Sequence, residues 1–140
     1  MNIEVNYVAV LLAGVASMVV GFLWYSPILF AKPWMKLMGY TAKSMGETQQ
    51  KMAKSYSLSF LLSLVMAYVL SHVMTFSSSY LHYAPVASGL TTAFWMWLGF
   101  VMPVQATDVL FGGKSGKLFA INTGYQLVSL LVMGVVIGLL

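Results

Sequence analysis

The sequence predicts an all-α fold, an integral membrane bundle of four transmembrane helices, and three observations lead to this prediction. Of 140 residues, 60% are hydrophobic and only 7% are charged, whereas soluble domains carry about 25% charged residues. The chain also contains four apolar stretches of the roughly 20 residues that a helix needs to cross a hydrocarbon core of about 30 Å. It has no cysteine, which excludes disulfides, zinc–thiolate sites and iron–sulfur clusters.

The four stretches cover approximately residues 5–30, 56–76, 87–111 and 118–140 and form one predicted domain over residues 1–140. The first stretch is too long for the apolar core of a signal peptide, and Glu4 stands where such a peptide carries basic residues. We therefore expect it to remain in the mature protein. Residues 31–55, between the first two stretches, are predicted to form a cytoplasmic loop.

The placement of the lysines predicts how the chain is oriented. All seven basic residues are lysines, and they fall in two segments expected on the same side of the membrane. Because cytoplasmic loops are enriched in basic residues, both segments are expected inside and both termini outside. Two short clusters do not make a continuous basic face, so no nucleic-acid partner is expected. The lysines are Lys32, Lys36, Lys43, Lys51 and Lys54 in the first segment, and Lys114 and Lys117 in the second.

A distinct element marks the cytoplasmic end of the first helix. Trp24 and Tyr25 have the amphipathic rings that favour the headgroup layer. Pro27 is expected to loosen the last helical turn and Pro33 to stop the helix, because proline removes a backbone donor. A short interfacial helix is then expected to start at Pro33. We interpret the element as a membrane exit, with a ligand site as the alternative. Its residues are Trp24, Tyr25, Ser26, Pro27, Pro33 and Trp34.

Small residues recur at four-residue spacing on three of the stretches, which predicts close helix packing. Lipid provides no hydrophobic force between helices, so they associate where small side chains let their backbones approach. For the serines of the second stretch, the alternative is a water-filled path, although a helical serine usually bonds the carbonyl four residues earlier. The predicted packing residues are Ala13, Ser17, Gly21, Ser59, Ser63, Ala67, Gly134 and Gly138.

The strongest candidate site is a polar cluster at the inner end of the last two helices. Gln105 and Asp108 precede the lysine turn, and Asn122 and Gln126 follow it. The hairpin is expected to bring all four to similar depth, and the members of each pair share a helix face. An ionisable residue at membrane depth is a functional candidate by default. The alternative is that Asp108 reaches water or pairs with a lysine of the turn, while the amides hold the hairpin together.

Other patterns in the sequence give weaker indications of a functional site. His72 and His82 have no accompanying carboxylate, which favours interfacial packing over a metal site. Eleven methionines are scattered over the chain, as is typical of residues that fill irregular gaps, and do not form a copper(I) motif. No metal or other cofactor is therefore expected. Trp95 and Trp97 are expected on opposite faces of the third helix, where each indole N–H needs an acceptor.

The two halves of the chain share short patterns that are compatible with a duplication. Y-x-L-x-x-L-L occurs at residues 56–62 and 125–131, which we place at the start of the second and fourth helices, and Leu-Phe ends the first and third stretches. Such a repeat would be parallel, with the two hairpins related by an axis along the membrane normal. Because tyrosine and leucine are common in this sequence, chance accounts for the match equally well.

Longer segments resemble a known family. The segments GFLWYSPILFAKPWMKLMG at 21–39, WLGF at 97–100, LFGGK at 110–114 and LFAINTGYQLVSLLVMG at 118–134 are similar to the family Domain of Unknown Function 1761. The likeness covers nearly the whole chain, and Trp-Tyr-Ser-Pro is its most specific part. The resemblance implies a small prokaryotic multipass protein of the inner membrane with no assigned activity, and it carries over no catalytic residue.

The chain shows no catalytic triad, carboxylate pair or phosphate loop, so no enzyme is expected. The leading prediction is a non-enzymatic membrane protein that acts through helix packing, as a self-associating bundle or as an accessory subunit of a membrane complex. Its partners are then the lipid bilayer and either a second copy or another membrane protein. The alternative is a small oligomeric transporter or channel that works around the polar cluster. A transporter requires a polar cavity near the midplane, whereas an accessory subunit requires dry contacts and one apolar face.

Overall fold

The computed structural model describes the backbone of residues 3–40 and 42–140 and the side chains of residues 3–40 and 53–140. Within these residues the chain is helical and has no strand. Four helical spans are long and apolar enough to cross a membrane, at Tyr7–Trp24, Ala53–Leu81, Pro85–Gly112 and Gly116–Leu139. The all-α fold with four spans, predicted from hydropathy, is thereby confirmed. In chain order the elements are α1 (Tyr7–Trp24), α2 (Ala31–Met38), α3 (Ala42–Leu81), α4 (Pro85–Met96), the π-helical turn η1 (Trp97–Val101), α5 (Met102–Gly112) and α6 (Gly116–Leu139).

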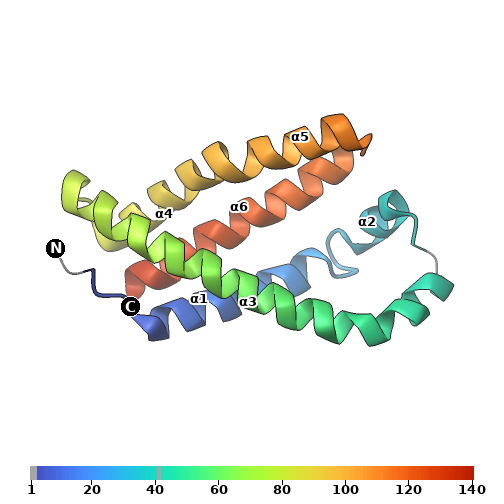
Figure 1. Cartoon of the computed structure of the whole chain (residues 1–140), viewed down its shortest axis with the longest axis horizontal. Coiled ribbons are helices and arrows are strands. Elements are labelled where there is room, and N and C mark those ends of the chain that lie inside the picture. Colours follow the sequence, from blue (N-terminus) through green and yellow to red (C-terminus); the bar gives the residue numbers. More distant parts are fainter. Residues whose placement is uncertain (1–2, 41) are drawn as a thin grey trace.

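The four spans form a bundle in which α6 packs against α1 and α4, and α3 packs against the other side of the same two helices. Both termini and the α3–α4 connection lie at one end of the molecule, and α2 and the α5–α6 turn lie at the other (Figure 1). The Asn6 side-chain amide donates to the carbonyl of Leu140 at 3.3 Å, which joins the two ends of the chain. The core of the bundle consists of Val10, Ala13, Ala67, Leu70, Met74, Ala93, Leu130 and Met133.

The first helix ends at Trp24, six residues before the expected boundary at residue 30. Pro27 has no N–H for the carbonyl of Leu23, four residues earlier, so the helical ladder stops there. Ser26 caps that carbonyl twice, through its backbone N–H at 3.2 Å and its hydroxyl at 2.7 Å. The loosening expected at Pro27 is therefore a complete helix end.

The expectation that Pro33 stops a helix is wrong. Pro33 is the third residue of α2, and the first N–H groups of a helix have no intrahelical partner, so proline is tolerated there. A short helix does follow the first span, as expected, and Gly39 ends it in the left-handed conformation with φ of 75°. The remaining residues of the expected loop 31–55 also differ from the prediction, because α3 begins at Ala42 and not at 56.

Helix α3 is 40 residues long, which corresponds to about 60 Å at the rise of an α-helix. That is twice the thickness of a hydrocarbon core, so the helix extends beyond its apolar span. The added turns are polar but contain many strong helix formers, such as alanine, lysine, glutamine and methionine. Hydropathy detects only the apolar part of such a helix.

The third span changes its helical register at η1. Pro103 has no N–H to give to the carbonyl of Gly99, four residues earlier. Just before it, the N–H of Met102 bonds to the carbonyl of Trp97, five residues earlier. The π-helical turn accommodates the loss of this hydrogen bond, so the helical span continues from Pro85 to Gly112 without a break.

Candidate functional site

The end of α1 is tied to the N-terminal third of α6 by two hydrogen bonds. The indole N–H of Trp24 donates to the carbonyl of Ile121 at 2.9 Å. The hydroxyl of Tyr25 donates to Oδ1 of Asn122 at 2.8 Å. These side chains therefore form a helix–helix contact in addition to any role at the headgroup layer. Gly124 makes room for this contact, because a Cβ there would lie 3.2 Å from the Trp24 ring.

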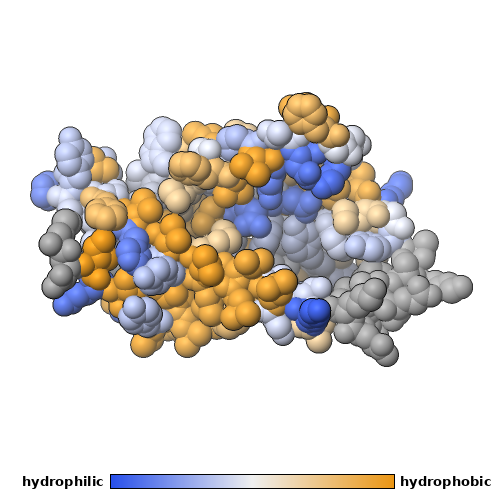
Figure 2. All heavy atoms as spheres, in the orientation of Figure 1, coloured by the Kyte–Doolittle hydropathy of each residue, from blue (hydrophilic) through white to orange (hydrophobic). Residues whose placement is uncertain are grey.

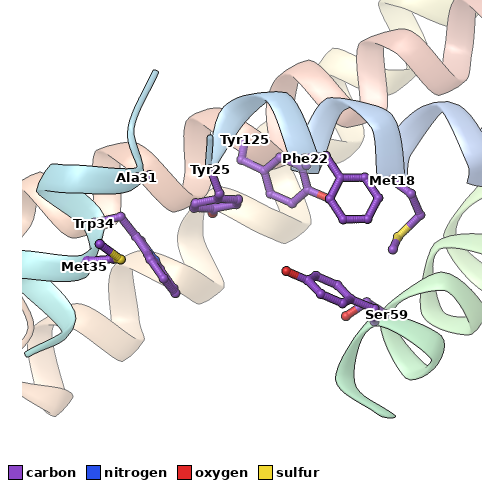
Figure 3. Close-up of a pocket in the computed structure, with 10 residues that line it drawn as sticks. Met18, Phe22, Tyr25, Ala31, Trp34, Met35, Ser59 and Tyr125 are labelled. Carbon is purple, nitrogen blue, oxygen red and sulfur yellow. The ribbon is translucent and has the colours of Figure 1, made fainter. Parts of the chain in front are cut away.

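A cavity of about 330 Å³ lies beside this contact, between α1, α2, α3 and α6. Aromatic rings from all four helices line it, and Figure 3 shows Tyr25, Trp34 and Tyr125 around one side of the space with Phe22 and Met18 further along α1. Tyr25 meets the rings of Trp34 and Tyr125 edge to face, with centroids 5.4 and 5.3 Å apart. The sequence prediction placed two of these residues in a membrane-exit element and missed the cavity.

The hydroxyl groups around the cavity differ in how well they are satisfied. Burial, and secondarily the neighbouring Tyr125, raises the pKa of Tyr25, which keeps this hydroxyl protonated as a donor to Asn122. The Tyr125 hydroxyl makes only a long bond of 3.5 Å to the carbonyl of Ser17. Among the described residues, the hydroxyls of Tyr56 and Ser59 make no hydrogen bond. Three of the four hydroxyls are thus available, wholly or partly, to a ligand.

Three members of the predicted polar cluster meet at a second, smaller cavity of about 80 Å³ between α5 and α6. Gln105, Asp108 and Asn122 line it together with Lys114. Gln126 does not, because it lies one helical turn, about 6 Å, further along α6. Of the four residues expected to form one cluster, the structure brings three to this cavity and leaves Gln126 outside it.

Asp108 forms an ion pair with Lys114 across the α5–α6 turn. Its side chain is 61% exposed and that of Lys114 is 48% exposed, and exposed pairs of this kind contribute at most about 1 kcal/mol. Of the alternatives that the sequence left open, this geometry corresponds to pairing with a lysine of the turn. The Gln105 side-chain oxygen is buried and has no hydrogen-bond partner in the described part of the chain.

The predicted packing residues are mostly used inside the chain. Ala13 and Ala67 are fully buried, and the hydroxyl of Ser17 meets that of Ser129 on α6 at 2.5 Å. Buried Ser63 donates to the carbonyl of Ser59, four residues earlier, at 2.9 Å, as a helical serine usually does. Ser59 itself is exposed and lines the large cavity.

The closest approach between helices is the crossing of α4 and α6. A Cβ on Gly134 would overlap the backbone of Gly89, and one on Gly138 would lie 2.7 Å from the carbonyl oxygen of Pro85. Gly21 faces α6 as well, with the Tyr125 hydroxyl 3.2 Å from its hypothetical Cβ. Gly89 was not among the predicted residues, although its position one turn from buried Thr92 and Ala93 places it on the same face.

The remaining candidates show no ligand chemistry. His72 bonds to the carbonyl of Tyr68 through Nδ1 at 3.0 Å, and no group of three or more potential metal ligands occurs among the described residues. Trp97 donates its indole N–H to the carbonyl of Thr123 on α6 at 2.9 Å. Trp95, on the other face, is 62% exposed.

The paired Y-x-L-x-x-L-L patterns do not start their helices, since α3 begins at Ala42 and α6 at Gly116. Both tyrosines lie inside a helix instead, and both line the large cavity.

Four apolar spans packed through glycine, alanine and serine define a multipass α-helical protein compatible with a membrane. The chain belongs to the family described as a protein of unknown function (DUF1761), whose model matches residues 8–138. This membership confirms the resemblance seen in the sequence. No curated protein and no solved structure matches the chain.

Proposed function

We propose that the protein is a non-enzymatic multipass protein of a prokaryotic inner membrane that acts by packing its third span against another membrane helix. That helix belongs to a second copy in a self-associating bundle, or to a larger complex in which the chain is an accessory subunit. The observation that carries the proposal is the indole N–H of Trp95.

Trp95 lies ten residues after Pro85, the first residue of α4, which is about 15 Å along the helix. That distance is half the thickness of a hydrocarbon core, so the side chain is at mid-depth in the membrane. It is 62% exposed, and its N–H has no acceptor among the described residues. Lipid tails supply no acceptor, and an unsatisfied donor there costs several kcal/mol. A neighbouring helix supplies an acceptor and removes this cost.

Beyond Trp95 the third span has no buried residue, whereas its first half packs against α6. In its most apolar stretch of 18 residues none is buried, whereas 33% of the corresponding stretch of α6 is buried. Phe100, Leu110 and Phe111 are 71%, 80% and 89% exposed. This face is apolar and accepts either lipid or a helix, while Trp95 favours the helix.

The orientation that supports this role has both termini outside. The two lysine-bearing segments lie at one end of the bundle and the termini at the other (Figure 1). The positive-inside rule therefore favours the lysine-bearing end as the cytoplasmic one.

A mass measurement on the protein in a mild detergent tests the proposal. The wild type is expected to appear as a multiple of the chain mass or with another membrane subunit, and Trp95→Phe is expected to shift it toward a single chain. Trp97→Phe is the matched control, because its N–H bonds inside the chain and its loss affects stability without affecting assembly. A wild type that is a single chain with no companion, or equal behaviour of the two variants, contradicts the proposal.

In the predicted polar cluster, the transporter alternative is supported by the Gln105 side-chain oxygen, which is buried without a hydrogen-bond partner among the described residues. The cavity around it holds at most a few water molecules, and the ion pair that borders it is largely exposed, at the lysine-bearing end of the bundle. A transport path requires a polar cavity near the midplane, so this cluster fits a support for the α5–α6 turn better than a substrate site.

A further inference from the structure

The large cavity at the lysine-bearing end has the properties of a small-molecule site. Its volume of about 330 Å³ falls within the range of about 300–1,000 Å³ for ligand pockets, which are mostly apolar with a few placed polar groups. Five of its ten lining residues are aromatic and two are methionines. The proposed packing of the third span does not use this cavity, since no residue of α4 or α5 lines it.

The cavity is held open by contacts that do not involve a ligand. Trp24 and Tyr25 fix the end of α1 on α6 through their hydrogen bonds. Trp34 on α2 then packs edge to face against Tyr25, and Tyr56 on α3 packs against Phe22 with ring centroids 5.4 Å apart. A preformed site of this kind does not have to be ordered when a ligand binds.

The chemistry of the lining restricts the ligand. No charged residue lines the cavity in the part of the chain whose side chains are described, which disfavours a charged ligand because uncharged walls do not replace its hydration. Aromatic walls favour a flat ring that stacks or meets them edge to face. The hydroxyls of Tyr56 and Ser59, which have no hydrogen-bond partner among the described residues, can act as donors, so the complementary ligand group is an acceptor such as a carbonyl oxygen.

We propose that the cavity between α1, α2, α3 and α6 binds an uncharged, flat, largely apolar small molecule that carries a hydrogen-bond acceptor. The rings of Trp34 and Tyr125 contact its apolar body, and the hydroxyls of Tyr56 and Ser59 donate to its acceptor. The molecule reaches the site from the membrane, where compounds of this class accumulate.

Contact quenching of tryptophan fluorescence by bromine tests the proposal on the full chain in phosphatidylcholine nanodiscs. The probe is 4-bromoacetophenone, which is flat and uncharged and has one carbonyl, and 1-bromo-4-ethylbenzene is the matched probe without an acceptor. We expect saturable quenching by the first probe, and binding weaker by about two- to tenfold for the second at equal concentration in the membrane, as for the loss of one hydrogen bond. The saturable part should disappear in Trp34→Phe and persist in Trp95→Phe.

Two pairs of variants locate the site. Ser59→Phe fills the cavity from α3 and should abolish saturable quenching. Ser57→Phe, also exposed on α3 but outside the cavity, should not. Tyr56→Phe removes one of the two donor hydroxyls and should reduce the difference in affinity between the two probes. The thermal midpoint of each variant, measured without probe, separates lost binding from lost folding, and a bound probe should raise the midpoint of the wild type.

Three results overturn the proposal. Quenching by 4-bromoacetophenone that rises linearly, without saturation, shows partition into lipid only. Equal affinity of the two probes for the wild type shows that the cavity does not recognise a hydrogen-bond acceptor. Quenching of Trp34 by phosphatidylcholine with brominated acyl chains that acetophenone, which carries no bromine, does not relieve shows that a lipid chain occupies the cavity.

Discussion

The crossing of α4 and α6 is so close that a single methyl group should separate the two helices. A Cβ on Gly89 would overlap the carbonyl oxygen of Gly134, and a Cβ on Gly134 would overlap that of Gly89. The obstructing atoms belong to the backbone and do not rotate away. Gly89→Ala therefore requires the helices to move apart.

The size of the effect follows from three contributions. Overpacking a tight contact typically costs about 1–3 kcal/mol, and we take the upper part of this range because the methyl group meets backbone atoms of Gly134. Part of this cost is dispersion, since a gap of about 0.5–1 Å already loses a quarter to a half of each contact. Alanine regains about 1 kcal/mol over glycine in a helix. The expected net loss is about 2 kcal/mol.

Gly99→Ala is the matched control in the same span. A Cβ at Gly99 has nothing within 4 Å, so only the helix preference remains, and the variant should be as stable as the wild type or more stable by up to about 1 kcal/mol. Unfolding in mixed micelles of mild detergent and dodecyl sulfate, followed by tryptophan emission, measures both variants. Equal stability of the two variants would show that α4 and α6 do not cross at these glycines.

Three further predictions concern other parts of the bundle. Ser17→Ala and Ser129→Ala each leave a buried hydroxyl without its partner, so each should lower the free energy of unfolding by about 0.6 kcal/mol and by no more than about 1.7. The double variant should lose less than the sum, and strict additivity would exclude a direct bond. Since the chain has no native cysteine, Ser115→Cys and Ser79→Cys report the orientation. An impermeant thiol reagent should label only Ser79→Cys in intact cells, and the reverse pattern would invert the topology. Asp108→Asn should change stability by less than about 1 kcal/mol, because its ion pair is exposed, and a folded variant that loses an ion or solute flux in vesicles would favour the transporter alternative.

The spans were predictable because a membrane imposes one requirement on every residue within it. The backbone must satisfy its hydrogen bonds internally, so each crossing is a helix of about 20 apolar residues, and hydropathy detects it directly. The helix ends were less predictable. At Ser26 the end depends on a side-chain cap of Leu23, and at Ala42 the helix continues in polar residues that carry no hydropathy signal.

The small polar cavity was partly predictable and the large cavity was not. Residues on either side of one turn, such as Asp108 and Asn122, are brought together by a hairpin of known geometry. The aromatic cavity depends instead on which faces of α1, α2, α3 and α6 converge, and Tyr56 and Tyr125 are far apart in the chain. Their matching positions in Y-x-L-x-x-L-L were the one sequence signal that linked them.

Because the small residues are buried inside the chain, they are not the residues to substitute when self-association is tested. Ser17 and Gly134 are the residues that a sequence analysis would select as oligomer contacts, yet both are occupied within the chain, by Ser129 and Gly89. Enlarging them perturbs the fold before it perturbs any assembly. On the side of the molecule that Figure 2 shows, the orange area is broadest over α1 and α3. The third span adds Phe100, Leu110 and Phe111 to the exposed hydrophobic surface. Because lipid also covers apolar side chains, exposure alone does not identify a contact there. A polar group without a partner at mid-depth does, and Trp95 is therefore the position at which folding and assembly can be separated by one substitution.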